Sequence, residues 1–225
     1  IYTDDKNAGG FGVSSNGRFI SYRLSKPAAI AKSTIVPAYV TESGFTENIP
    51  GRTKVGAPLG TQELFLYDRV KDTVYSIHTD VLPGIRDLPD YVTDYPVKFA
   101  DAIKKPAVRK VNISGVAWAP HASFAVVDIR STDNKDRWLM LLDSTGNLSP
   151  VDRQHDNAWI GGPGTGWFDG GNLGWISDRL FWFQSEKTGY SHLYITDIAG
   201  KETKALTSGN FEVQSVQLSA DKKFF

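Results

Sequence analysis

The sequence predicts an all-β fold, a partial β-propeller of four-stranded antiparallel blades, with about three blades and the start of a fourth. Three observations predict this fold. A short strand–turn–strand pattern recurs along the 225 residues, and two further strand-like runs follow each of its first three copies. The last interval, from Phe181 to Phe224, agrees with the period of roughly 40–50 residues that is typical of propeller repeats. Four antiparallel strands in each unit make one blade.

The repeated pattern consists of an apolar strand, a small polar turn and a second apolar strand. Its turns contain the Ser, Asn, Asp and Gly residues that favour tight connections. Each copy therefore predicts the first two strands of one blade. The four copies lie at residues 11–22, 116–127, 173–183 and 216–225.

The third and fourth strands of each blade are predicted from runs rich in β-branched and aromatic residues. Short polar connections separate the two strands of each pair, as in a hairpin. The connections lie at residues 69–72, 144–147 and 199–201. The strand pairs lie at residues 63–68 and 73–77, at 137–143 and 148–151, and at 192–197 and 203–206.

Two segments interrupt this scheme, at residues 27–61 and 80–111. Both are rich in Pro, Gly, Ala and charged residues, so we interpret them as insertions into one propeller region that spans residues 1–225. The second insertion can hold a short helix around residues 97–104. Because a closed propeller needs more blades, and because an apolar strand opens at residues 216–225 without a partner, we expect the chain to be a piece of a longer protein.

The composition excludes several classes of protein. Acidic and basic residues balance at 25 each, so the basic excess of a typical nucleic-acid-binding domain is missing. The apolar runs are shorter than the roughly 20 residues of a membrane-spanning helix, and any signal peptide of the longer protein is expected to lie outside this chain. Cysteine is absent, which excludes disulfides, cysteine nucleophiles and thiolate metal sites. The four histidines lack metal-ligand spacing, so we expect neither a metal nor a cofactor.

Two motifs near the end of the chain carry a family resemblance. Residues 189–194 read Gly-Tyr-Ser-His-Leu-Tyr and follow the acidic Glu186. Residues 206–213 read Leu-Thr-Ser-Gly-Asn-Phe-Glu-Val. This joint pattern, over residues 185–213, resembles the N-terminal propeller of the dipeptidyl peptidase IV branch of the prolyl oligopeptidase family of serine peptidases. The rest of the chain resembles that family only at the level of the repeat.

The resemblance implies a propeller that caps an α/β-hydrolase domain with a Ser-Asp-His triad. The nucleophile of such a domain sits in a Gly-x-Ser-x-Gly elbow, and the nearest match here, residues 12–16, lacks the closing glycine. We therefore expect the parent protein to be a serine exopeptidase, with its hydrolase domain downstream of Phe225 and no catalytic residue in this chain. The branch also binds the substrate amino terminus through adjacent glutamates, and their absence here puts strict dipeptide release in doubt.

The resemblance also implies partners and a location. The expected partners are the protein's own C-terminal α/β-hydrolase domain and a peptide substrate, and a second copy of the chain is a further candidate. The expected location is the bacterial periplasm or the medium outside the cell. The alternative function is a non-catalytic propeller that binds another protein, as the periplasmic TolB-like propellers do. A Gly-x-Ser-x-Gly elbow beyond residue 225 would distinguish the peptidase from this alternative.

Strand order predicts which end of the propeller carries function. In an antiparallel blade, the hairpin between strands 2 and 3 and the crossover to the next blade emerge at the same end. This end collects both insertions, the charged hairpin 131–136 and the crossover 152–164. Long loops on a rigid scaffold usually carry binding. We therefore expect this end to face the hydrolase domain and to line the substrate chamber.

Charged and aromatic residues at this end are the candidates for substrate binding. An arginine can hold a substrate carbonyl or carboxylate through two parallel hydrogen bonds, and an aspartate can hold an ammonium group. The competing interpretation is that these charges pair with one another and fix the loops. Trp167 is a further aromatic candidate in the crossover, whereas the tryptophans of the strands are expected in the core. The main candidates are Arg130, Asp133, Asp136, Arg137, Arg153, Asp156 and Trp159.

Overall fold

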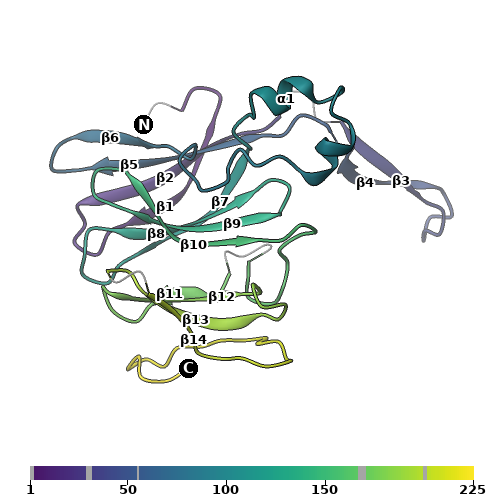
Figure 1. Cartoon of the computed structure of the whole chain (residues 1–225). Helices are drawn as coiled ribbons and strands as arrows, with labels where there is room; N and C mark the ends of the chain where they lie inside the picture. The colour runs from purple at the N-terminus through teal and green to yellow at the C-terminus, as the bar shows by residue number, and fades with distance from the viewer. Residues whose placement is uncertain (1–2, 29–31, 55, 167–170, 200–201) are drawn as a thin grey trace.

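The computed structural model describes residues 3–28, 32–54, 56–166, 171–199 and 202–225. Three four-stranded antiparallel sheets lie one above another in chain order, as Figure 1 shows, and a two-stranded hairpin stands apart from them. The predicted fold class, a partial propeller of four-stranded blades, is confirmed.

The three blades follow one another along the chain, each with consecutive strands side by side except where the hairpin interrupts blade 1. Blade 1 contains β1 (Asn7–Val13), β2 (Phe19–Lys26), β5 (Thr61–Asp68) and β6 (Thr73–Ile77). Blade 2 contains β7 (Val111–Trp118), β8 (Ala125–Ser131), β9 (Asp136–Leu142) and β10 (Leu148–His155). Blade 3 contains β11 (Leu173–Trp175), β12 (Leu180–Ser185), β13 (His192–Asp197) and β14 (Glu202–Ala205).

The core consists of two apolar layers, one on each face of blade 2. Side chains alternate between the faces of a strand, so Val127 and Met140 pack toward blade 1 while Val126 and Leu139 pack toward blade 3. Every residue of β8 is buried, because neighbouring blades cover both faces. The first layer also contains Phe19, Leu64, Leu66, Ile113, Ile129 and Trp138, and the second contains Trp175, Phe181, Phe183 and Tyr194.

The sequence repeat corresponds to a repeated turn. In the first copy the Ser14 amide donates to the Phe19 carbonyl oxygen at 2.9 Å, and in the fourth the Ser219 amide donates to the Phe224 carbonyl oxygen at 2.8 Å. The fourth copy forms only this turn. Residues 216–225 form no strand and pair with none in the described part of the chain, so the predicted opening strands of a fourth blade are not formed.

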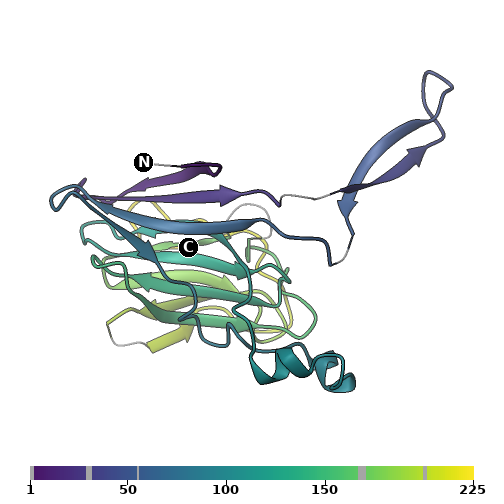
Figure 2. The same ribbon diagram turned by 90° about the horizontal axis from the view of Figure 1, so that it is seen from above.

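The first insertion contains an arm that the sequence analysis did not predict. Strands β3 (Ser33–Ala38) and β4 (Glu47–Thr53) form a hairpin that projects away from the blades, as Figure 2 shows. The arm lacks the alternation of a half-buried strand because solvent reaches both of its faces. It carries exposed apolar side chains at Ile35, Val36, Tyr39, Val40, Phe45 and Ile49.

The second insertion contains a 3₁₀ helix, η1 (Asp90–Asp94), and a short α-helix, α1 (Ala100–Lys104), which lies within the predicted helical range. Blade 2 holds this insertion in place. The Trp138 indole Nε1 donates to the Pro83 carbonyl oxygen at 2.9 Å, and Leu82 and Ile85 are buried in the first core layer. No helix in the described residues is both long and apolar enough to cross a bilayer.

Strand β10 is longer than predicted. It extends to His155, so the first four residues of the predicted crossover 152–164 belong to the strand. A register shift between Pro150 and Asp152 interrupts the pairing of β10 with β9, and an outer strand tolerates polar residues. For these two reasons the sequence pattern did not indicate the second half of the strand. The corrected strand places His155 opposite Asp136, and Arg153 two residues away on the same face.

The short turns gather at one end of the blades, here called the turn end. Asn16 Nδ2 donates to Ser123 Oγ at 2.9 Å between blades 1 and 2, and the His121 amide donates to Asp178 Oδ1 at 2.8 Å between blades 2 and 3. The arm, the helical insertion, the β8–β9 hairpin and the crossover after β10 lie at the opposite end, here called the loop end (Figure 1).

Asp68 at the turn end makes the stability of the fold depend on pH in the acid range. Its pKa is lowered from 3.8 to about 2, mainly by the Arg18 guanidinium, whose Nη2 lies 2.7 Å from Oδ2. Burial opposes this change, and the Val70 and Lys71 amides add to it. A carboxyl group whose pKa is lower in the folded chain than in the unfolded chain stabilises the fold at pH values above the unfolded-state pKa. That stabilisation is lost as the pH falls from about 4 to about 2.

We expect Asp68→Asn to remove this part of the acid dependence. Chemical unfolding measured at several pH values should give a flatter slope between pH about 4 and about 2 for the variant than for the unchanged chain. Equal slopes in the two proteins would contradict the assignment.

Candidate functional site

A buried carboxylate at the loop end organises the surrounding charges. The Asp136 side chain at the start of β9 is 0 % exposed. It accepts a hydrogen bond from Arg109 Nη2 at 2.6 Å and another from Arg153 Nε at 2.9 Å, and His155 Nδ1 lies 3.0 Å away. These four residues are called the Asp136 hub.

The hub connects three segments that are distant in sequence. Arg109 belongs to the helical insertion, and its guanidinium also donates to the Gly84 carbonyl oxygen at 2.9 Å and to Asp133 Oδ2 at 3.4 Å. Arg153 belongs to β10 and reaches Asp87 Oδ2 at 2.7 Å. Gly84 has a φ of +68°, a backbone conformation that favours glycine, and a side chain there would have to displace the Arg153 guanidinium.

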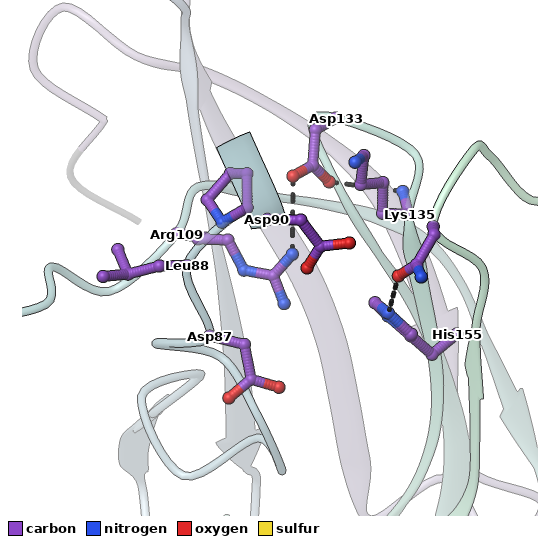
Figure 3. Close-up of a pocket in the computed structure, with 9 residues that line it drawn as sticks. Asp87, Leu88, Asp90, Arg109, Asp133, Lys135 and His155 are labelled. Atoms are coloured by element: carbon purple, nitrogen blue, oxygen red, sulfur yellow. Dashed lines mark hydrogen bonds and ion pairs between the residues drawn. The ribbon is translucent and has the colours of Figure 1, made fainter. Parts of the chain in front are cut away.

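A pocket of about 190 Å³ opens above the hub, here called the hub pocket. Figure 3 shows the Asp90 carboxylate pointing into the space between Arg109 and His155. The walls come from the helical insertion on one side, and from the β8–β9 hairpin and the end of β10 on the other. The lining residues are Asp87, Leu88, Pro89, Asp90, Arg109, Asp133, Lys135, His155 and Asn157.

Asp133 is an anion at neutral pH. Burial alone would raise the pKa of its carboxyl group, but hydrogen bonds from Ser131, the Lys135 amide and Arg109 lower that pKa below its ordinary value. The pocket wall therefore keeps a fixed negative charge beside the Arg109 guanidinium.

Arg137 lies between two blades. Its side chain is 0 % exposed, and its Nη2 and Nε donate to the carboxylate of Asp128 at 2.9 and 3.1 Å. Its Nη1 donates to the Gln184 carbonyl oxygen of blade 3 at 2.9 Å. Arg137 therefore links blade 2 to blade 3 and presents no surface to a ligand in this structure.

Arg130 is also buried and holds the crossover. Its Nη1 donates to the Ile160 carbonyl oxygen at 3.4 Å, and its Nη2 donates to the Thr165 carbonyl oxygen. Burial lowers the pKa of Arg130, and the nearby positive charge of Arg137 lowers it further. Arg130 therefore fixes the crossover, and like Arg137 it does not open toward the pocket.

Asp156 and Trp159 lie at the surface of the crossover. Asp156 Oδ1 accepts hydrogen bonds from the amides of Ala158 at 2.6 Å and Trp159 at 3.0 Å. Trp159 is 56 % exposed, and the next turn is held by Glu186 Oε1, which accepts from the Gly161 amide at 2.9 Å. The indole is therefore presented to solvent on an ordered loop. Trp167 lies outside the described residues.

The structure thus separates the predicted site residues into three groups. Asp133 lines the hub pocket, and Asp136 and Arg153 pair with each other in the Asp136 hub. Arg130 and Arg137 are buried between loops and blades, and Asp156 and Trp159 lie on the crossover surface. The main candidates from the sequence did not include the lining residues Asp87, Asp90, Arg109, Lys135 and His155. In the described residues, no group of three or more His, Asp or Glu side chains could hold a metal ion.

Two of three comparisons with known proteins found matches, and these two agree. Residues 60–224 match the family model described as the dipeptidyl peptidase IV (DPP IV) N-terminal region. No curated protein matched the chain. The solved structures that match the chain include two of the same fold.

The first is dipeptidyl peptidase 4 of Porphyromonas gingivalis, at 17 % identity and a TM-score of 0.55 over 91 % of this chain and 25 % of that one. The second is described as a dipeptidyl aminopeptidase IV from Bacteroides ovatus, at 12 % identity and a TM-score of 0.63 over 99 % of this chain and 32 % of that one. The chain therefore spans a quarter to a third of these proteins.

Proposed function

The chain belongs to the family of dipeptidyl peptidase IV N-terminal regions, and on that premise we propose that it is the propeller part of a longer serine peptidase. The family match over residues 60–224 is the observation that carries this proposal. The two structural relatives are three to four times as long as the part that aligns, which leaves room for a hydrolase domain in proteins of this architecture.

The loop end is the surface proposed to meet the hydrolase domain and to position the peptide substrate. Support comes from the gathering of both insertions, the β8–β9 hairpin and the crossover at this end. Asp133, Arg153, Asp156 and Trp159 are accessible enough for direct contact with substrate. The candidates Arg130, Asp136 and Arg137 are buried, so their proposed role is to hold those side chains in place.

The proposal is tested on the longer protein that contains this chain. The purified protein should hydrolyse proline-containing peptide amides and should be labelled by a serine-directed phosphonate. The 225-residue chain is the matched control, because it contains no Gly-x-Ser-x-Gly elbow and should show neither property. A longer protein that cleaves nothing and takes no label would overturn the proposal and favour an interaction propeller.

The proposed location of the parent protein is the bacterial periplasm or the medium outside the cell, following the family resemblance. Fractionation of cells that express the longer protein with an epitope tag tests this point. Recovery in the cytoplasmic fraction alone would contradict it.

A second copy of the chain is a proposed partner, and the arm is the surface that suits it. Val40 is 98 % exposed, and an isolated two-stranded hairpin is only marginally stable in water. The arm carries Glu42 and Glu47 toward its tip, and Arg52 and Lys54 at its base. Two arms that pack antiparallel would place acidic tips beside basic bases.

We expect Val36→Asp, in the middle of β3, to weaken self-association about tenfold or more, because a charge would replace an apolar side chain at the centre of the arm, where 54 % of it is exposed in the single chain. Analytical ultracentrifugation over a range of concentrations measures the change. Val74→Asp, at a valine that is 50 % exposed on β6 of blade 1, is the matched control and should have no effect. A chain that stays monomeric at all concentrations would contradict the dimer.

A further inference from the structure

The Trp159 indole packs over the backbone of the crossover after β10. A Cβ atom at Gly161 would lie 2.9 Å from the indole Nε1, so a side chain at residue 161 would have to displace the indole. The other side of the ring remains open to solvent, since the residue is exposed. The place of the indole at the loop end therefore depends on where the backbone of Gly161 is held.

Glu186, in the hairpin between β12 and β13 of blade 3, holds that backbone. Its Oε1 accepts a hydrogen bond from the Gly161 amide at 2.9 Å. Its Oε2 lies so close to Gly162 that a side chain at residue 162 would have to displace the carboxylate. The neighbouring cation, Lys187, pairs with Asp152 at 3.4 Å. Because a hydrogen bond to a carboxylate is about twice as strong as a neutral one, this contact holds the crossover firmly.

The crossover is also held on each side of this contact. The Ile160 amide donates to the Asn134 carbonyl oxygen of the β8–β9 hairpin at 2.8 Å. The Pro163 carbonyl oxygen accepts a hydrogen bond from Ser191 Oγ at 2.6 Å, and Ser191 is fully buried. The crossover is therefore fixed at three points, to blade 2 before the carboxylate contact and to blade 3 after it. The carboxylate fixes the point that lies beneath the indole.

An exposed indole that is held in place is suited to recognition. The ring of Trp159 offers a large apolar face, and a side chain that is already ordered loses little entropy when a ligand packs against it. The three contacts of the crossover supply this order. The chemistry that matches the ring is an apolar or aromatic side chain of a peptide, which buries its surface against the indole.

We propose that Glu186 is a positioning residue of the loop end, which fixes the Trp159 indole so that the ring packs against an apolar side chain of the peptide substrate. The substrate contact rests on the proposed function, whereas the placement of the indole does not. Glu186 acts through the indole and does not touch the substrate itself. The same geometry assigns a role to Gly161 and Gly162, where side chains would displace the indole and the carboxylate.

Fluorine NMR of the longer protein, labelled with 5-fluorotryptophan, tests the placement of the indole. The Trp159 resonance is the one that Trp159→Phe removes. Glu186→Ala takes away the acceptor of the Gly161 amide and should shift or broaden this resonance, whereas Glu186→Gln keeps an acceptor oxygen and should leave it unchanged. The matched control is Glu202→Ala, an exposed carboxylate on β14, which should also leave it unchanged. A Trp159 resonance that stays the same in Glu186→Ala would overturn the proposal, as would an equal change in all the tryptophan resonances.

Hydrolysis of proline-containing peptide amides by the longer protein tests the substrate contact. Glu186→Ala and Trp159→Ala should each raise KM by up to about tenfold, which corresponds to one aromatic contact, and leave kcat unchanged. The double variant should be no worse than Trp159→Ala, because Glu186 acts only through the indole. Additive effects, or an unchanged KM in both single variants, would overturn the proposal. A longer protein that hydrolyses nothing would overturn the proposed function, and the fluorine measurement would still decide the placement of the indole.

Discussion

Replacing Arg137 by methionine is expected to lower the free energy of unfolding by about 3–5 kcal/mol. The substitution would leave the Asp128 carboxylate, 2 % exposed, without its counter-charge in the layer between blades 2 and 3. It would also remove the hydrogen bond from Arg137 Nη1 to the Gln184 carbonyl oxygen, which joins the two blades. Denaturant unfolding followed by tryptophan fluorescence measures the loss.

Two further variants show whether the loss comes from the unpaired charge. The double variant Arg137→Met, Asp128→Leu removes both charges and should recover much of the stability, because an apolar pair of similar volume avoids a lone buried ion. Arg179→Met breaks the exposed pair with Asp197 and should change stability little. If Arg137→Met lowers the free energy of unfolding no more than Arg179→Met does, Arg137 does not stabilise the contact between blades 2 and 3.

Replacing Asp136 by asparagine is expected to lower the free energy of unfolding by about 2–3 kcal/mol, because hydrogen bonds to a charged group contribute more than neutral ones. The amide would keep one acceptor oxygen where the carboxylate now serves Arg109, Arg153 and His155. The loss should be concentrated in the helical insertion, which Arg109 ties to the hub. Hydrogen exchange should become faster across residues 80–109.

Asp133→Asn is the matched control, since Asp133 also pairs with Arg109 but is 37 % exposed and lies 3.4 Å away. Asp133→Asn should lower the free energy of unfolding by less than about 1 kcal/mol. Uniform acceleration of exchange over all three blades in Asp136→Asn would mean that the hub stabilises the whole fold and not the insertion.

The blades were predictable because their signals are local. Turn residues such as Ser14 and Asn16, and the apolar strands beside them, lie within one short stretch of chain. The arm gave no such signal, since Ile35 and Val36 are exposed although they stand in a strand. Its two strands pair with each other and solvent reaches both faces, so no alternation of apolar and polar residues marks them in the sequence.

The candidate site was predictable where one hairpin creates it. Asp136 and Arg153 come together through the β9–β10 pairing, which follows from the order of the strands. Arg109 reaches the same carboxylate from a segment 27 residues upstream, and no spacing indicates that contact. Sequence also cannot show that Arg137 lies between two sheets, because its burial depends on blade 3.

The central claim is that the loop end of this propeller faces a hydrolase domain in the longer protein. Site-specific photo-crosslinking tests it most directly, with p-benzoylphenylalanine placed at Asn157 on the loop end or at His121 on the turn end, where the side chain is 85 % exposed. We predict that the probe at Asn157 crosslinks to sequence outside these 225 residues that carries the Gly-x-Ser-x-Gly elbow, and that the probe at His121 does not. Crosslinks from His121 to that domain, with none from Asn157, would contradict the account.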